Sequence, residues 1–241
     1  MGVHLGTHPV GIGQELLDIS TTQKHKLGEK AVIGGREYRY VQAGAATLVV
    51  GNVLQSAAQV ANHQNLTPVA AAIGDTSITV TLGATAATEN QYAEGLAIVD
   101  TTPGLGYAYP IESHPAANGS AAVTIRLGQP IQVALTTSSR ITLVANRHKG
   151  VIQAPVTTLT GSVVGVAISA LTASTYGWVQ VKGEGAVLIA GTPAVGAAVI
   201  SPSGTAGAAA VDPTNAAVGH VGTMMVTGVS GRVQPVHLNI S

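Results

Sequence analysis

Residues 176–189, YGWVQVKGEGAVLI, decide the fold class of this chain. They predict a short strand that carries the only tryptophan, Trp178, then a Gly-Glu-Gly turn and a second apolar strand. The run GTP at 191–193 follows, and a further short strand is expected over 196–199. No side chain in this stretch is suited to catalysis. The stretch therefore predicts a part that packs and presents a surface, as in a structural or interaction protein.

The apolar content of the chain is unusual in kind. Hydrophobic residues make up 46% of the 241 residues, yet there is no Phe, one Trp and six Tyr. The apolar mass is therefore mostly Ala, Val, Leu and Ile, which pack well in sheets but give few large anchors for a deep pocket. The length is sufficient for one large β domain or two modest ones with a proper core.

The charge content is low. Charged residues make up 9% of the chain, with eleven basic and eleven acidic side chains and a formal net charge of zero. A soluble monomer usually carries about 25% charged residues, so much of this surface is expected to face protein. These values are typical of a subunit of a permanent assembly. The alternative is a sandwich whose outer faces are covered by Thr, Ser and Gln.

Several partners and compartments are disfavoured. The densest basic groups, 24–30 and 147–149, are too small for a nucleic-acid surface. No apolar run approaches the roughly 20 residues of a membrane-spanning helix. The first residues lack the pattern of a secretory signal, and Thr7 lies one place too late for a myristoylation signal. The absence of cysteine excludes disulfides and thiol catalysis. We expect no nucleic acid and no membrane as partners.

Residues 1–30 predict an extended N-terminal arm. Their apolar residues stand singly between glycines and polar residues, and only 14–19 could form a turn or two of helix. Such a segment cannot bury itself, so it is either disordered or laid on a neighbour, and the number of Leu and Ile favours the neighbour. The expected contact residues are Leu5, Val10, Ile12, Leu16, Leu17 and Ile19.

A hairpin is predicted next, with strands over 31–33 and 37–41 and a turn at Gly34-Gly35. Tyr38 and Tyr40 would share one face of it. Together with Trp178 these two tyrosines are the expected packing anchors. A short helix is possible near 54–61, where the sequence is rich in Ala and Gln.

The remainder predicts short strands with Gly, Pro and Asn at the breaks, which is typical of a sandwich or barrel. The expected strands are 77–82, 96–100, 108–111, 121–127, 140–144, 151–152, 163–168, 178–181, 187–189, 197–200, 218–221 and 233–238. A boundary near Gly150 divides them. The fold class is therefore all-β, with an antiparallel sandwich or barrel over 31–150 and a smaller barrel-like domain over 151–241.

No residue pattern indicates catalysis, a cofactor or a metal. His4 and His8 are four residues apart, but Gly6 and Pro9 prevent the helix that would align them. No Gly-x-Ser-x-Gly run occurs, and the glycines at 11 and 13 lack the rest of a dinucleotide motif. We expect no catalytic, cofactor-binding or metal-binding residue. The histidines stand at 4, 8, 25, 63, 114, 148, 220 and 237.

Seven runs share a loose structural character. They are LAIVD at 96–100, GYAYPIESHPA at 106–116, ALTTSSRITLVAN at 134–146, YGWVQ at 176–180, GTPAVG at 191–196, PSGTAG at 202–207 and VGHV at 218–221. The first four resemble structural proteins of tailed bacteriophages, in particular capsid decoration or cement proteins. The last three resemble the small β-barrel modules of phage head proteins. The resemblance covers roughly residues 30–241 and brings no catalytic residue.

The resemblance implies a β-rich body on the outer face of an icosahedral capsid, often a homotrimer, with a terminal arm that grips the major capsid protein. The arm predicted over 1–30 and the low charge agree with that implication. We therefore expect a non-enzymatic virion protein, assembled in the host cytoplasm, that cements neighbouring capsid subunits.

Two other classes of protein stay open. A phage tail or baseplate component, or a protein that binds host glycans, would share the β-rich composition. An enzyme acting on glycans would need a pair of acids in one cleft, and Asp75, Glu112 and Asp212 are the acids that could converge. Asp75 follows Gly74 directly, so we expect it to shape a turn.

Overall fold

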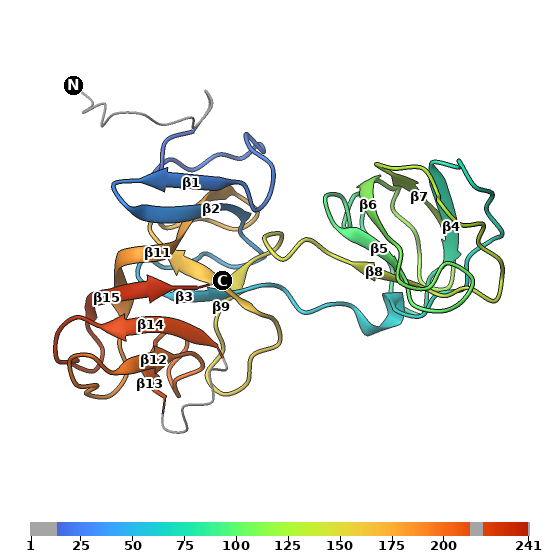
Figure 1. Cartoon of the computed structure of the whole chain (residues 1–241). Helices are drawn as coiled ribbons and strands as arrows, with labels where there is room; N and C mark the ends of the chain where they lie inside the picture. The colour runs from blue at the N-terminus through green and yellow to red at the C-terminus, as the bar shows by residue number, and fades with distance from the viewer. Residues whose placement is uncertain (1–13, 213–218, 241) are drawn as a thin grey trace. The chain divides into compact units, whose positions relative to one another are not determined.

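The computed structural model describes residues 14–212 and 219–240. Within them it contains fifteen strands and one short 3-10 helix (Figure 1). Every pairing between named strands is antiparallel, which confirms the expected all-β class. Two compact units are present: Met1–Ala58 together with Arg147–Ser241, here the discontinuous unit, and Gln59–Asn146, here the inserted unit.

This division differs from the predicted one, which joined 31–150 and separated 151–241. The strands that precede the inserted unit pair with strands that follow it, so 30–58 belongs to the same sheet as 147–240. The chain leaves this sheet after β3 (Val53–Gln55) and returns at β9 (Ile152–Gln153), which is the antiparallel neighbour of β3. The boundary expected near Gly150 lies close to this return.

The discontinuous unit is a ten-stranded sheet in the order β13-β12-β14-β15-β11-β10-β3-β9, with β2 also paired to β11 and β1 to β2. Its other strands are β1 (Lys30–Ile33), β2 (Arg36–Gln42), β10 (Val163–Ala167), β11 (Tyr176–Leu188), β12 (Ala198–Ile200), β13 (Ala210–Val211), β14 (His220–Met224) and β15 (Val233–Asn239). The hairpin expected around Gly34-Gly35 is present as β1 and β2.

The central strand, β11, corrects one prediction. The expected Gly-Glu-Gly turn is absent, and 176–188 forms one continuous strand with an irregularity between Gln180 and Lys182. The first half of β11 pairs with β2 and the second half with β15. A Cβ on Gly185 would come within 2.6 Å of Leu238 Cδ1, so this glycine permits close approach of β15.

The helix considered near 54–61 is also absent. Residues 53–55 form β3, which lies between β10 and β9, and the only helical turn nearby is η1 (Ala61–His63). All three residues of β3 are buried, and the Gln55 side chain donates to Thr160 Oγ1 at 2.6 Å. Burial on both faces and a satisfied amide therefore outweigh the local helix preference.

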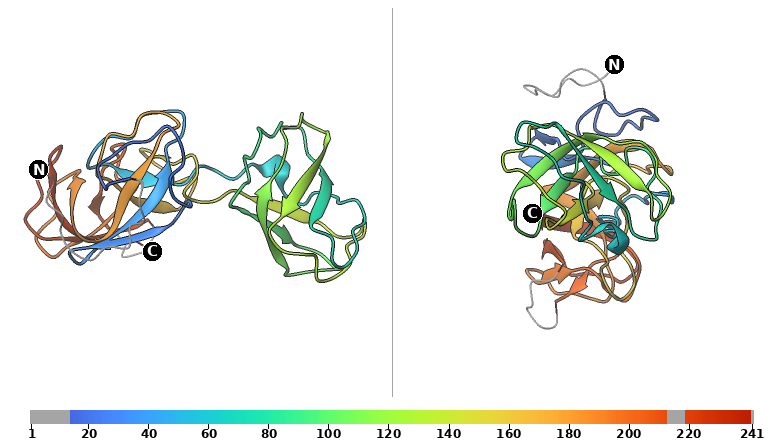
Figure 2. Two further views of the ribbon diagram at one scale, coloured as in Figure 1. Left: turned by 90° about the horizontal axis from the view of Figure 1, so that it is seen from above. Right: turned by 90° about the vertical axis from the view of Figure 1, so that its right-hand side faces the viewer.

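The inserted unit is a five-stranded sheet in the order β4-β7-β6-β5-β8, and Figure 2 shows its strands curling around a common interior. Its strands are β4 (Ser77–Thr81), β5 (Leu96–Val99), β6 (Ala108–Ser113), β7 (Ala122–Leu127) and β8 (Ile141–Val144). Burial alternates along β7, as expected for a half-buried strand. The outer strands are linked by the segment 66–69: Leu66 exchanges hydrogen bonds with Ile141 of β8, and Val69 N donates to Thr79 O of β4. Sheet and segment thus form a barrel-like closure.

Candidate functional site

The N-terminal segment 14–29 lies on the discontinuous unit. Ser20 and Tyr176 exchange backbone hydrogen bonds of 2.8 and 3.0 Å. Gly28 N donates to Tyr40 O, and Tyr40 N donates to Glu29 O. This part of the segment predicted as a free arm is therefore bound to the chain's own sheet. Residues 14–29 are therefore not a free extended arm, although some of their side chains face solvent.

The six expected contact residues of the arm fall into three groups. Leu5, Val10 and Ile12 lie outside the described residues. Leu16 is half-buried against the aromatic cluster described next. Leu17 and Ile19 are exposed, at 67% and 45%, so they are the described arm residues that face solvent.

Trp178, Tyr40 and Tyr38, the expected packing anchors, are all buried in one cluster with Leu27 and Ala31. Trp178 of β11 is directly opposite Tyr40 of β2, and their rings meet edge to face with centroids 5.1 Å apart. The His25 ring contacts both of these rings, again at 5.1 Å. The segment 14–29 therefore covers the only tryptophan of the chain.

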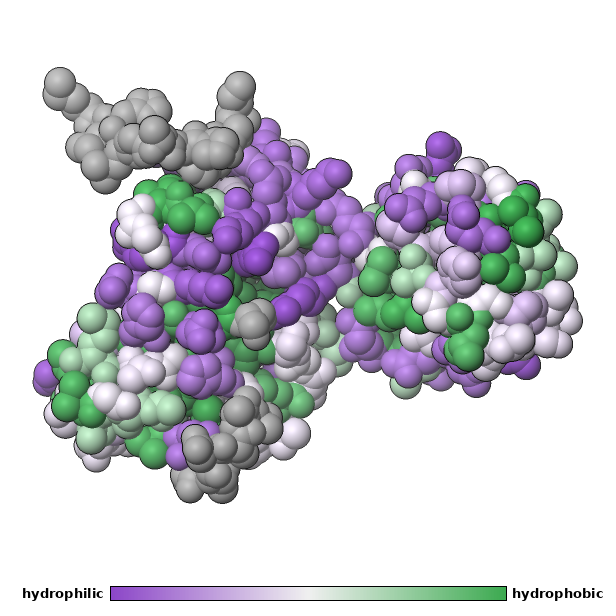
Figure 3. Space-filling model, viewed as in Figure 1, coloured by the Kyte–Doolittle hydropathy of each residue, from purple (hydrophilic) through white to green (hydrophobic). Residues whose placement is uncertain are grey.

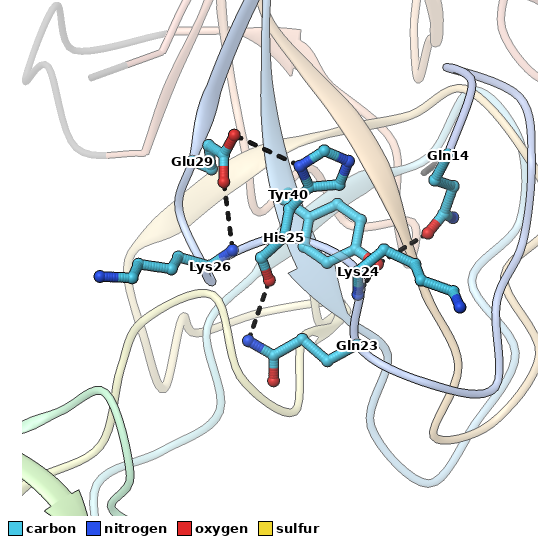
Figure 4. Close-up of polar contacts among 7 residues, drawn as sticks. All are labelled: Gln14, Gln23, Lys24, His25, Lys26, Glu29 and Tyr40. Carbon is cyan, nitrogen blue, oxygen red and sulfur yellow. Dashed lines mark hydrogen bonds and ion pairs between the residues drawn. The ribbon is translucent and has the colours of Figure 1, made fainter. Parts of the chain in front are cut away.

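Polar contacts fix this segment over Tyr40 (Figure 4). The Tyr40 hydroxyl donates to Gln14 Oε1 at 2.7 Å and accepts from Lys24 N at 3.1 Å. The Gln14 amide donates to Asp18 O and to Tyr176 O. Burial raises the pKa of Tyr40, and the hydrogen bond from Lys24 N opposes this rise. Tyr40 is thus a neutral phenol whose donor and acceptor positions are both used.

His25 sits between the ring cluster and a carboxylate. Its Nδ1 lies 3.3 Å from Glu29 Oε1, while Glu29 Oε2 accepts from Lys26 N at 3.2 Å (Figure 4). Within the described residues, His25 Nε2 and Trp178 Nε1 are buried and have no hydrogen-bond partner. These two ring nitrogens therefore lose contact with water when the His25 and Trp178 rings pack together, which indicates tight packing in this cluster.

Two arginines and a histidine, Arg39, Arg147 and His148, lie beside the same segment. Arg39 Nη1 donates to Gly28 O at 3.0 Å, and a Cβ on Gly28 would meet His148 Nδ1 at 2.8 Å. Burial, followed by the charges of Arg147 and Arg39, lowers the pKa of His148 from 6.5 to about 4. Burial and Arg39 also lower the pKa of Arg147.

Exposed apolar side chains gather at the loops near β12, β14 and β15. The loop 191–197 lies against the loop 225–232, because Gly228 N donates to Pro193 O and Gly196 N donates to Met224 O. The turn 48–51 adjoins them, because a Cβ on Gly51 would meet Val233 Cγ2 at 2.9 Å. The residues, here the apolar loop surface, are Val49 (51% exposed), Val50 (47%), Val195 (64%), Met225 (43%), Val226 (40%), Val229 (41%) and Val233 (50%).

Figure 3 shows that the hydropathy of the surface differs between two regions of the discontinuous unit. Hydrophilic residues predominate over β1 and β2, and the hydrophobic share is larger around β12, β13 and β14. Exposed apolar side chains gathered on neighbouring segments are a feature of surfaces that contact another macromolecule. The apolar loop surface is therefore our candidate functional site.

The inserted unit contains a buried polar network. His63 Nε2 lies 2.9 Å from Thr85 O, so it donates, and Nδ1 then accepts from the Tyr92 hydroxyl. His114 has the opposite tautomer: Nδ1 donates to Pro115 O, and Nε2 accepts from Tyr92 N at 3.0 Å. Burial raises the pKa of Tyr92 to about 12. Both rings are buried, so the network ties β6 to η1 and the turn around Tyr92 and offers no open reaction site.

The acids considered for glycan chemistry have separate structural roles. Asp75 Oδ2 accepts from Ala72 N at 2.8 Å and shapes the turn, as expected. Glu112 pairs with Arg126 at 2.8 Å on the surface. Asp212 belongs to the discontinuous unit, whereas the other two belong to the inserted unit. Within the described ranges, no three His, Cys, Asp or Glu side chains gather to hold a metal ion. His4 and His8 lie outside those ranges.

The chain was compared with family models, curated proteins and solved structures, and nothing matched in any of the three comparisons. Among the described residues no helix has the length and hydropathy that a membrane crossing requires.

Sequence reasoning missed the apolar loop surface and the network of His63, Tyr92 and His114. The loops carry isolated valines that no periodicity distinguishes, and only tertiary contacts bring them together. The network joins residues 22 and 29 positions apart. The one sequence signal was the presence of Val and Met in segments rich in Gly, where exposed loops are usually polar.

Proposed function

We propose that this protein is a non-enzymatic structural protein of a phage particle, which decorates the outer surface of the capsid and cements neighbouring major capsid subunits. The observation that carries the proposal is the apolar loop surface. Its seven side chains are 40–64% exposed and lie on the turn 48–51, on the loops 191–197 and 225–232, and at the start of β15; a hydrogen bond from Gly228 N to Pro193 O joins the two loops. When another protein covers such a surface, the free energy of the complex falls by about 25 cal/mol per Å² of apolar area removed from water.

The placement of this surface suits attachment. Backbone hydrogen bonds anchor the loops to β14 and β15, so little conformational entropy is lost on binding. Several weak contacts of this kind on one particle reinforce one another, because each attached copy raises the effective concentration of its remaining contacts. Occupied sites also stabilise the folded shell by mass action.

The N-terminal residues contribute a second contact in this proposal. Leu17 and Ile19 are exposed at the start of the described segment, and Leu5, Val10 and Ile12 precede it. Because 14–29 packs over Trp178, a truncation that tests the arm must end at residue 13. Removal of 14–29 would expose the aromatic cluster and confuse loss of binding with loss of folding.

Co-sedimentation of the purified chain with undecorated phage shells tests the proposal. In the test variant Val226→Asp and Val229→Asp place two charges on the apolar loop surface, and we expect at least a tenfold loss of bound protein. The matched control carries Val69→Asp and Ile73→Asp, two exposed apolar residues of the inserted unit, 57% and 68% exposed. Equal binding by the test variant and the wild type would reject the apolar loop surface as the capsid contact.

A second candidate, binding of host glycans, is favoured by one observation in the inserted unit. The Tyr107 ring is 41% exposed and stacks on Tyr109 with an interplanar angle of 12°, next to Leu105, which is 61% exposed. An exposed aromatic ring is a surface on which sugar rings can stack. Glycan-array binding that Tyr107→Ala abolishes would favour this function over capsid decoration.

A further inference from the structure

One end of the inserted unit is formed by three loops. The first, 70–76, precedes β4, the second, 100–107, joins β5 to β6, and the third, 128–140, joins β7 to β8. Because neighbouring strands of this sheet are antiparallel, β4, β6 and β8 begin towards this end, and β5 and β7 finish towards it. We call the three loops the loop end. Loops that a rigid sheet holds in place are where binding residues are usually found.

Hydrogen bonds and close packing hold the three loops together. Ala71 of the first loop and Leu135 of the third exchange backbone hydrogen bonds of 3.0 and 2.9 Å. The second loop lies on the same leucine, because a Cβ on Gly104 would meet Leu135 Cδ2 at 2.7 Å. Ser139 Oγ of the third loop donates to Pro103 O of the second at 2.8 Å. A ligand that binds to the loop end would therefore order little additional backbone.

A pair of stacked tyrosines lies where the second loop enters β6. The rings of Tyr107 and Tyr109 are nearly parallel, with an interplanar angle of 12° and centroids 6.1 Å apart. Tyr109 is buried in the hydrophobic cluster of the unit, and its hydroxyl accepts from Gln132 N at 3.1 Å. The half-exposed ring of Tyr107 therefore rests on a fixed aromatic partner. Leu105 of the same loop and Ile73 of the first loop are exposed as well, at 61% and 68%.

The loop end contains three charged residues, and each of them contacts its own unit. Asp75 Oδ2 accepts from Ala72 N at 2.8 Å. One oxygen of Asp100 is buried, and the other accepts from Thr142 Oγ1 at 2.6 Å. Arg140 Nη1 donates to two backbone carbonyls of its own loop, both at 2.8 Å. The exposed neutral hydroxyls and amides of the loop end include Thr102, Gln129, Gln132, Thr136, Thr137 and Ser138.

These groups suit a neutral sugar. One face of a pyranose ring presents C–H groups that pack on an aromatic ring, and its hydroxyls donate and accept hydrogen bonds. Gln132 Nε2 donates to Pro130 O at 2.9 Å, which orients the amide oxygen of Gln132 as an acceptor. The inserted unit contains two basic residues and five acids, a formal charge of −3, so its field disfavours anionic ligands.

We propose that the loop end is a binding site for neutral glycans, in which a hexopyranose stacks on Tyr107 beside Leu105 and its hydroxyls bond to polar groups of the third loop, Gln132 among them. The inference rests on glycan binding, the second candidate function above, and gives it a site and a class of ligand. The loop end belongs to the inserted unit, whereas the apolar loop surface belongs to the discontinuous unit. Loss of one contact therefore leaves the other open to measurement.

Titration of the full chain with lactose, cellobiose and mannobiose, followed by NMR, tests this proposal. These sugars end in galactose, glucose and mannose. We expect the methyl signals of Ile73 and Leu105 and the ring signals of Tyr107 to shift in a saturable way with at least one of them. Absence of such shifts with all three sugars overturns the proposal. Glucuronate should bind no more tightly than glucose, and tighter binding of glucuronate would contradict the assignment to neutral glycans.

Substitutions at the stacking ring make the test specific. Tyr107→Ala should weaken sugar binding by about tenfold, whereas Tyr107→Phe, which keeps the ring, should stay within about twofold of the wild type. The matched control is Leu96→Ala, at a 38% exposed residue where β5 begins, towards the opposite end of the same unit. Wild-type affinity in Tyr107→Ala, or an equal loss in Leu96→Ala, would refute the site. If Tyr107→Ala does not fold, Leu105→Asp at an exposed loop position gives the same comparison.

Co-sedimentation with undecorated shells separates this site from the capsid contact. Tyr107→Ala should bind shells as the wild type does, and the variant with Val226→Asp and Val229→Asp should bind sugars as the wild type does. Loss of shell binding in the second variant alone, with sugar binding retained, is the result expected if both proposals hold. Sugar binding by a chain that never binds shells would reject the capsid contact and leave the glycan site standing. Loss of shell binding in Tyr107→Ala would mean that the loop end contacts a capsid protein, which overturns the glycan assignment.

Discussion

The two units of this protein both form a β fold without Phe or Cys, but their hydrophobic clusters are built differently. The inserted unit has one hydrophobic cluster, and its residues come from one continuous stretch of chain. The described residues of the discontinuous unit form three clusters, and one of them, the aromatic cluster, depends on the N-terminal segment 14–29. The comparison teaches that the inserted unit is complete in itself, whereas the discontinuous unit needs pieces from both sides of the insertion.

The largest expected effect concerns the aromatic cluster. Tyr40→Ala would remove a fully buried ring that contacts Trp178, His25 and the Gln14 side chain, so we expect the free energy of unfolding to fall by about 4 kcal/mol. Chemical denaturation followed by Trp178 fluorescence measures this unit selectively, because Trp178 is the only tryptophan.

The comparison predicts that this loss stays within one unit. Methyl NMR signals of the inserted unit should keep their wild-type unfolding midpoint in Tyr40→Ala. Tyr107→Ala, which removes an exposed tyrosine of the inserted unit, is the control and should leave the Trp178 transition unchanged. A simultaneous shift of both transitions would mean that the units unfold as one, contrary to this account.

The next effect is confined to the inserted unit. His114→Ala leaves the buried Tyr92 N–H without its acceptor and opens a cavity, so we expect a loss of about 3 kcal/mol. His237→Ala, at an exposed histidine of the discontinuous unit, should change stability by less than about 0.5 kcal/mol. Hydrogen exchange resolves the two units, and faster exchange in 59–146 alone is the expected pattern. Uniformly faster exchange would count against the independence of the units.

A pH effect should distinguish the discontinuous unit. The pKa of His148 is about 4 in the folded protein against an ordinary value of 6.5, so the unfolded chain binds more protons between these values. Its contribution is therefore complete above pH 6.5 and is lost as the pH falls towards 4. Because His148 is partly exposed, we expect the loss to be on the order of 2 kcal/mol.

His148→Gln should flatten this dependence. Denaturation midpoints of the Trp178 transition at pH 7, 5.5 and 4 measure it, and His237→Gln is the control with an exposed histidine. An unchanged pH dependence in His148→Gln would show that other groups cause the acid response.

The smallest effect concerns the N-terminal segment. Gln14→Ala removes an acceptor of the Tyr40 hydroxyl and two donated hydrogen bonds, for an expected loss of about 1–2 kcal/mol. If the segment loosens, the Trp178 emission maximum should move to longer wavelength before global unfolding. Gln23→Ala, whose amide donates to His25 O, is the control and should cause a smaller shift. An identical shift in both variants would mean that Gln14 is not the anchor.

The sequence predicted local elements well where burial alternates. The strands near 77–82 and 121–127 are present because apolar and polar side chains alternate along them, which requires no knowledge of distant residues. The hairpin over β1 and β2 was predictable because the Gly34-Gly35 turn joins two short strand-like runs. Tyr38, Tyr40 and Trp178 stood out because large aromatic residues are rare in this chain.

Elements that depend on distant pairing were not predictable. The insertion is visible only when β3 pairs with β9, almost a hundred residues later in the chain. Gly185 suggested a turn, but its actual reason is the Leu238 side chain on β15. The predicted arm extended to residue 30, whereas 14–29 packs on the sheet. This was not predictable because no local pattern shows that Gln14 binds Tyr40. The apolar loop surface has the same origin, since it combines residues from separate segments.

Electron microscopy of decorated particles tests the central claim most directly, because it shows which surface of the protein meets the shell. The account predicts density for the discontinuous unit with the loops 191–197 and 225–232 against major capsid subunits. It further predicts loss of that density for the variant with Val226→Asp and Val229→Asp. Density on the tail, attachment through the inserted unit, or full occupancy by that variant would contradict the account.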